Sequence, residues 1–210
     1  MRLPSFAQHP LFFGLLAGIA IPAGGAWADT SKAVFGGGCF WCMEEAFDKL
    51  DGVISTTSGY CGGDTDDPTY ESVSAGDTGH VEVVEVAYDT DKLDYSDLLY
   101  VYWRNIDPFA VNRQFCDEGS PYRSALFPMN DDERALAEST KAELAERFGE
   151  SIATEINDID TFYAAEDYHQ DYYSKNPVRY NFYKNACGRP DRLDEIWGDE
   201  AMPHESFAGP

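Results

Sequence analysis

The sequence predicts an α+β fold, a two-layer sandwich in which helices cover one face of a mixed sheet with a ferredoxin-like core. Three observations predict it. A short apolar segment, 33–35, runs through three glycines into an amphipathic stretch. Residues 81–88 alternate as a strand does. Two further segments, 94–106 and 130–149, have helical patterns. A long irregular C-terminal segment completes the prediction.

The first elements follow from apolar spacing and glycine. Residues 33–35 (Ala-Val-Phe) predict a strand, and the glycines at 36–38 predict a tight turn. Phe40, Met43, Phe47 and Leu50 recur at helical spacing, so a helix should begin at Cys39 and end near Gly52. Beyond it the pattern predicts an extended segment at 53–58, a loop at 59–64 and a turn at 66–70.

Residues 81–88 (Val-Glu-Val-Val-Glu-Val-Ala-Tyr) give the clearest strand. Alternation puts Glu82, Val84, Val86 and Tyr88 on one face and the intervening residues on the other. Because both faces are mostly apolar, we expect a central strand, with Glu82 close to buried neighbours.

The second half contains two predicted helices and one predicted strand. Helix 94–106 is followed by an irregular stretch, 112–127, rich in charge and glycine. A capping-box pattern at 130–133 opens a helix that reaches Gly149, and residues 151–156 predict a strand. After Thr161 the chain is polar and tyrosine-rich, with weak helical signals only.

Residues 1–28 resemble a secretory signal peptide. Arg2 supplies the positive charge, residues 11–21 the apolar centre, and Ala26-Trp27-Ala28 a cleavage site. We expect cleavage after Ala28 and a periplasmic or secreted protein with one domain over 29–210. A retained N-terminal anchor is the alternative, although the apolar run is shorter than the ~20 residues of a membrane span.

Charge and cysteine content narrow the function. The formal net charge is −23, which argues against nucleic acid or an anionic membrane as partner. Five cysteines are present, and an odd number in an exported protein leaves at least one thiol unpaired or redox-active. Only one Cys-x-x-Cys pair occurs, without the second ligand pair of a zinc site. We therefore expect sulfur chemistry rather than a bound metal.

Cys39 is the leading candidate for that chemistry. A thiol at the start of a helix lies near free N–H groups and the positive end of the helix dipole, so we expect it to ionise easily. Glu82 is a candidate proton donor, because burial would raise its pKa, although a strand-end glutamate facing water is equally compatible with the pattern. His80 and His169 are candidate bases, with a surface or hydrogen-bonded role as the ordinary alternative.

Several ordered blocks of the chain resemble the family of peptide methionine sulfoxide reductase A. The stretch Gly38-Cys39-Phe40-Trp41 is similar to the family signature. Further similar blocks follow in order between about residues 33 and 177, at 58–63, 68–70, 76–82, 107–108, 122–125 and 165–170.

The resemblance implies reduction of methionine S-sulfoxide, free or in proteins, with Cys39 as nucleophile. Glu82, Tyr70 and Tyr122 would donate to the sulfoxide oxygen, where charge develops as the S–O bond breaks. Phe40 and Trp41 would surround the substrate methyl group, and Asp117 would hold the substrate backbone, although its neighbours differ from the family pattern.

The Cys39 sulfenic acid would then need a resolving thiol. The resemblance favours Cys187 slightly, with Cys42 as a direct resolver or relay, and gives Cys61 and Cys116 no role. It implies no bound cofactor or metal and a thioredoxin-like dithiol as electron donor. We expect a monomer. Two alternatives stay open: a thiol–disulfide oxidoreductase using Cys39 and Cys42, and a metal- or partner-binding module.

Overall fold

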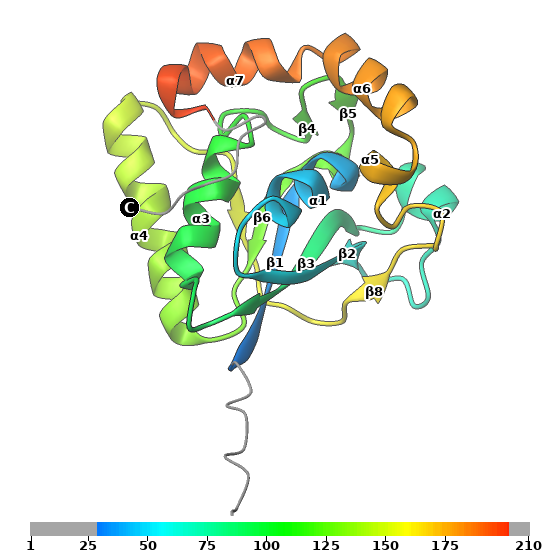
Figure 1. The fold of residues 1–210 in the computed structure, drawn as a ribbon, viewed down its shortest axis with the longest axis horizontal. Helices are drawn as coiled ribbons and strands as arrows, with labels where there is room; N and C mark the ends of the chain where they lie inside the picture. Colours follow the sequence, from blue (N-terminus) through cyan, green and yellow to red (C-terminus); the bar gives the residue numbers. More distant parts are fainter. Residues whose placement is uncertain (1–28, 202–210) are drawn as a thin grey trace, which may run out of the picture.

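The computed structural model describes residues 29–201, so the predicted signal peptide lies outside the described residues. Six strands form one sheet in the order β7-β6-β1-β3-β2-β8 (Figure 1). Pairing is antiparallel except between β6 and β7, which confirms a mixed sheet. The strands are β1 (Thr30–Gly37), β2 (Val53–Cys61), β3 (Val81–Asp89), β6 (Ser124–Phe127), β7 (Glu155–Ile156) and β8 (Tyr163–Ala164).

The ferredoxin-like core is also confirmed. Helix α1 (Phe40–Asp48) connects β1 to β2, and helix α3 (Tyr95–Arg104) lies between β3 and β6. The four strands β6-β1-β3-β2 then follow the order fourth, first, third, second of a β-α-β-β-α-β unit. In this register Tyr60 lies opposite Glu82.

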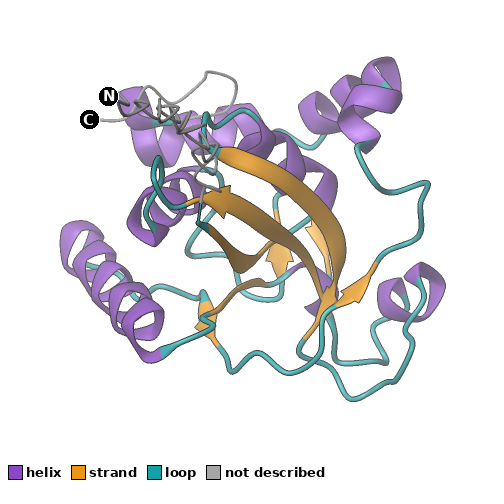
Figure 2. Ribbon diagram, turned by 60° about the horizontal axis from the view of Figure 1, so that its bottom comes forward, coloured by secondary structure: helices purple, strands orange, loops and turns teal. Residues whose placement is uncertain are grey.

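The two faces of the sheet are covered differently. Val84 and Val86 of β3 join the main core with Met43 of α1 and Leu98 of α3. The opposite face carries a smaller cluster around Val83, against which Ile159 and Phe162 pack. Glu82 shares a face with Val84 and Val86, as the alternation predicts, and that face is the one that the helices cover. Figure 2 shows the twisted sheet with its surrounding helices.

Several predicted boundaries are wrong. Strand β2 continues through Cys61 into the predicted loop, and helix α2 (Tyr70–Ser74) begins in the predicted turn, capped by Thr69. The stretch predicted to be irregular contains strands β4 (Arg113–Gln114) and β5 (Asp117–Glu118), the short helix η1 (Ser120–Tyr122) and β6. These elements are short and depend on tertiary pairing, which local sequence reveals poorly.

Helix α4 (Asp131–Phe148) agrees closely with its prediction. The Asn130 side chain accepts from the Glu133 N–H, and Gly149 ends the helix with a left-handed φ of 65°. The predicted strand at 151–156 is reduced to β7.

The C-terminal segment is helical rather than irregular. Helices α5 (Tyr172–Lys175), α6 (Pro177–Ala186) and α7 (Arg189–Trp197) precede the short η2 (Gly198–Glu200). Proline in the first turn suits α6 and α7, because that N–H has no partner within a helix. Leu193 and Trp197 of α7 are buried in the main core. Within residues 29–201, no helix has the length and apolar character to cross a bilayer.

Candidate active site

The glycine turn brings the start of α1 close to the sheet. A Cβ on Gly37 would lie 2.5 Å from Sδ of Met43, and Gly38 adopts a φ of 82°, which disfavours other residues. Cys39 is the N-cap of α1, and its carbonyl accepts from the Cys42 N–H at 3.1 Å. The glycines therefore let Cys39 lie close to the C-terminal end of β1 without steric conflict.

A cavity of about 60 Å³ lies beside Cys39. Its lining comes from α1, α2, β3, β5, η1 and α6, and it includes every catalytic and substrate-binding residue that the resemblance implies. The lining residues are Cys39, Phe40, Trp41, Tyr70, Glu82, Asp117, Tyr122 and Tyr183. Among these lining residues, only Tyr183 was not proposed from the sequence.

Glu82 is the acid of this cavity. The side chain is only 2% exposed, and its Oε2 accepts from the Phe40 N–H at 3.1 Å. Burial raises the pKa of Glu82 to about 8, against the opposing effect of the Phe40 hydrogen bond. The carboxyl is therefore mostly protonated at neutral pH, and it can donate a proton beside Cys39.

Tyr70 and Tyr122 supply two more donors. Burial raises the pKa of both phenols, so both hydroxyls stay protonated at neutral pH. Glu166 positions this region, because its two oxygens accept from the Tyr70 N–H and the Tyr60 hydroxyl, each at 2.9 Å. The start of α2 is thereby tied to β2.

Aromatic rings form the apolar wall. Trp41 stacks on Tyr172 with ring centroids 3.8 Å apart, and its Nε1–H donates to Nδ1 of His169 at 3.1 Å. His169 also packs against Phe40, with centroids 4.9 Å apart. His169 therefore supports Trp41 rather than serving as a base.

His80 also has a structural role. Its Nδ1 accepts from the Gly63 N–H at 3.1 Å, and its Nε2 lies 2.8 Å from the Thr65 carbonyl. Both ring nitrogens are thus engaged by the loop after β2, and neither candidate histidine is among the residues that line the cavity.

Cys39 and Cys42 form a buried pair, 6% and 3% exposed. Burial, and then the hydrogen bond and charge of Cys42, raise the pKa of Cys39 well above its ordinary value. The expectation that Cys39 itself ionises easily is therefore wrong in this state. The hydrogen bond from Cys39 lowers the pKa of Cys42 to about 6, with help from the charge of Arg189 and against the effect of burial. These opposite directions favour ionisation of Cys42 over ionisation of Cys39.

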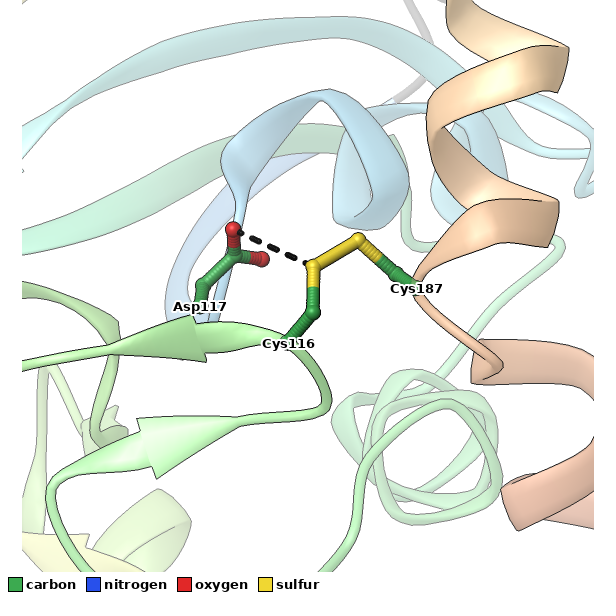
Figure 3. Close-up of side chains that lie close together, drawn as sticks. All are labelled: Cys116, Asp117 and Cys187. Atoms are coloured by element: carbon green, nitrogen blue, oxygen red, sulfur yellow. Dashed lines mark hydrogen bonds between the residues drawn. A yellow bond between two sulfur atoms is a disulfide. The ribbon is translucent and has the colours of Figure 1, made fainter.

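Cys187 is joined to Cys116 by a disulfide with Cα atoms 4.9 Å apart (Figure 3). Cys116 follows β4 and is exposed, while Cys187 is the C-cap of α6 and is half-buried. Asp117 Oδ1 lies 3.8 Å from the Cys116 sulfur, a contact without donation because that sulfur carries no proton. The three side chains lie close enough for a metal, but the disulfide leaves no thiolate to bind one.

Cys61 lies apart from this chemistry. It is the last residue of β2, fully buried with Val83 on the face of the sheet opposite α1. Cys116, for which the resemblance implies no role, is bonded to Cys187, and Cys61 lies in a strand within the stretch predicted to be a loop.

Three groups near the site escaped the sequence analysis: Tyr183, Glu166 and the Cys116–Cys187 disulfide. Glu166 belongs to the recognised block at 165–170, so its place in that block was a usable signal. Tyr183 had no comparable signal, because its position depends on a helix that the sequence predicted only weakly.

The model of the family called peptide methionine sulfoxide reductase matches residues 31–201. The chain belongs to this family. Among curated members, the MsrA of Bacillus licheniformis is 47% identical over 79% of this chain and 93% of its own length. The MsrA of Natronomonas pharaonis is 53% identical over 70% of this chain and 84% of its own.

A solved reductase shares the fold. The reduced form of Mxr1 from Saccharomyces cerevisiae superposes with a TM-score of 0.67 at 36% identity, covering 71% of this chain and 87% of the yeast chain. The family and the α+β fold expected from the sequence are thus both confirmed.

Proposed function

We propose that this protein reduces methionine S-sulfoxide, free or in proteins, to methionine, and so repairs oxidised exported proteins. The observation that carries the proposal is the contact between the first turn of α1 and a protonated acid. The Phe40 N–H, next to Cys39, is bound to Glu82, whose carboxyl keeps its proton at neutral pH. A thiol, an acid and two phenols then surround one small cavity.

The chemistry follows from these groups. The Cys39 sulfur attacks the sulfoxide sulfur while Glu82, assisted by Tyr70 and Tyr122, delivers a proton to the departing oxygen. The attack forms a bond between the two sulfur atoms. The protonated oxygen then moves from the substrate sulfur to the Cys39 sulfur as the S–O bond and the new S–S bond both break, so methionine leaves and Cys39 keeps the oxygen as a sulfenic acid. The proton that the Cys39 thiol loses returns to the Glu82 carboxylate. Sulfur of the substrate is reduced and sulfur of Cys39 is oxidised.

Cys42 is the first resolving thiol in this proposal. The interaction with Cys39 lowers the pKa of Cys42, so Cys42 is the thiol of the pair that ionises more readily. Attack on the sulfenic acid forms the Cys39–Cys42 disulfide and, with a proton, releases water. The role of Cys187 as a resolver stays a prediction, because its sulfur is bonded to Cys116 in this state.

The electron donor in this proposal is a thioredoxin-like dithiol, which reduces the Cys39–Cys42 disulfide and becomes oxidised itself. We place the protein in the periplasm or outside the cell. The signal-like segment 1–28 supports that location, and so does a disulfide between Cys116 and Cys187, since such bonds persist in oxidising compartments. We expect a monomer, and size-exclusion chromatography tests this.

The proposed function is tested by mixing the reduced protein with one equivalent of a blocked methionine S-sulfoxide and counting methionine. About one methionine per protein is expected from wild type and none from Cys39→Ser. Insulin reduction without methionine formation would instead assign the protein to the thiol–disulfide oxidoreductases.

A further inference from the structure

Tyr183 connects the C-terminal helices to the cavity beside Cys39. It lies on α6, lines that cavity, and meets Trp41 edge to face with ring centroids 5.9 Å apart. Its hydroxyl donates a 2.5 Å hydrogen bond to Oδ2 of Asp117 on β5. Two elements far apart in sequence therefore meet at one side of the site.

The disulfide fixes both members of this pair. Cys116 directly precedes Asp117, and the Cys187 N–H donates to the Tyr183 carbonyl at 2.9 Å, one helical turn away. The bond between Cys116 and Cys187 therefore ties the backbone that carries the donor to the backbone that carries the acceptor. Figure 3 shows the disulfide bridging the segment around Cys116 to the end of α6, beside Asp117.

The Asp117 carboxylate depends on the hydrogen bond from Tyr183 to keep its position. Burial raises the pKa of its carboxyl, while the Tyr183 hydrogen bond and the charge of Arg189 oppose that effect. Without a donor, a half-buried carboxylate would turn toward water or take up a proton, and either change removes an acceptor from the cavity.

We propose that Tyr183 is a positioning residue for substrate binding, which holds the Asp117 carboxylate toward the cavity, and that the Cys116–Cys187 disulfide sets the distance between them. The inference rests on the proposed function and deepens it, because it assigns the C-terminal helices a role in recognising the substrate backbone. Asp117 accepts from a substrate N–H, Tyr183 fixes Asp117, and the disulfide acts without exchanging electrons.

The test measures single-turnover rates against the concentration of a blocked methionine S-sulfoxide, without added reductant, so that the disulfide stays closed. The rates, plotted against substrate concentration, give a half-saturating concentration and a limiting rate for each protein. Tyr183→Phe should raise the half-saturating concentration about three- to tenfold, the loss expected for one hydrogen bond, and leave the limiting rate within about twofold. Asp117→Asn should do the same, and the double variant should lose no more than either single one.

Tyr173→Phe is the matched control. The Tyr173 hydroxyl also donates to an aspartate, Oδ2 of Asp48 at 2.9 Å, but neither residue lines the cavity. This control should bind substrate as wild type does. The double variant Cys116→Ser/Cys187→Ser should raise the half-saturating concentration in the same direction as Tyr183→Phe.

Three results would overturn the inference. The first is a Tyr183→Phe protein with the half-saturating concentration of wild type, and the second is a disulfide-free variant with that same wild-type value. The third is an Asp117/Tyr183 double variant whose half-saturating concentration rises by the product of the two single increases. If wild type itself forms no methionine, the proposed function fails instead. Melting temperatures of all variants separate a binding defect from loss of fold.

Discussion

The Phe40 N–H donates to Oε2 of Glu82 at 3.1 Å, so the acid is bound to the residue that follows the nucleophile. This contact joins the first turn of α1 to the start of β3 beneath it. Cys39 and Glu82 cannot separate without breaking it. The reacting sulfur and the proton donor are thus positioned by one backbone hydrogen bond rather than by two independent loops.

Replacing Glu82 by Gln should slow the first single turnover by about 10²- to 10⁴-fold, the usual contribution of a positioned acid. Glutamine keeps the size of the side chain and an oxygen for the Phe40 N–H but has no acidic proton. Rapid-quench measurement of methionine checks this. Glu85→Gln is the control, because Glu85 lies on the same strand and pairs with Lys32 at 2.7 Å. A Glu82→Gln protein as fast as wild type would exclude the proposed acid.

The same group predicts the pH dependence. With a pKa of about 8, Glu82 loses its proton above pH 8, so the single-turnover rate should fall there in wild type. The folded protein holds this proton while an unfolded glutamate, with a pKa near 4.5, has lost it. This group therefore makes folding less favourable by about 1.4 kcal/mol per pH unit as pH rises between the two pKa values.

Glu82→Gln removes the contribution of this carboxyl to the pH dependence of the free energy of unfolding. Denaturant unfolding from pH 5 to pH 9 should show a smaller decline in the free energy of unfolding for Glu82→Gln than for wild type. Parallel declines for the two proteins would mean that Glu82 is ionised in the folded state.

Cys42→Ser should still form about one methionine per protein but should lose sustained turnover with a thioredoxin-like donor, because no adjacent thiol resolves Cys39. Disulfide mapping of wild type after one equivalent of substrate should find Cys39 joined to Cys42. Cys61→Ala is the control, since Cys61 is buried on the opposite face of the sheet. Sustained turnover by Cys42→Ser would assign resolution to Cys187 or another thiol.

The disulfide should also contribute to stability. It joins residues 71 positions apart, and closure of such a loop is worth about 4 kcal/mol in the chain-entropy model. Cys116→Ser/Cys187→Ser should lower the free energy of unfolding by about 2–4 kcal/mol in denaturant titrations without reductant. Wild type in the presence of reductant should approach the variant, whereas two unchanged curves would show that the bond is not closed in solution.

Glu166→Gln should impair the site indirectly. Both glutamate oxygens accept, from Tyr60 and from the Tyr70 N–H, so an amide can satisfy only one donor and opposes the other. We expect turnover to fall about tenfold and stability by about 1–3 kcal/mol. Glu71→Gln, at an exposed position of α2, is the control. Normal activity in Glu166→Gln would show that Tyr70 keeps its place without this carboxylate.

The sequence predicted the parts of the fold that local patterns determine. Alternation along 81–88 placed Glu82 on the same face as Val84 and Val86, and the Asn130 cap and Gly149 bounded α4 closely. Short elements such as β4 and β5 could not be predicted, because two-residue strands exist only through their pairing. The C-terminal helices were missed because their signals are weak alone, and burial of Leu193 and Trp197 stabilises α7.

The candidate site was predicted through ordered motifs rather than through local chemistry. Those motifs named the cavity residues from Cys39 to Tyr122, and the structure brings them together. Helix position alone predicted an easily ionised Cys39, whereas burial and Cys42 raise the pKa of its thiol. The pairing of Cys116 with Cys187 depends on how α6 packs against the β4–β5 hairpin, which spacing along the chain does not determine.

The bond between positions 116 and 187 also encloses a large continuous part of the polypeptide, including α4 and the loop that covers the far face of the sheet. A protease that cut once inside this enclosed stretch would leave two fragments still covalently attached to each other. A nicked molecule would therefore migrate as a single species on a non-reducing gel and separate only after reduction.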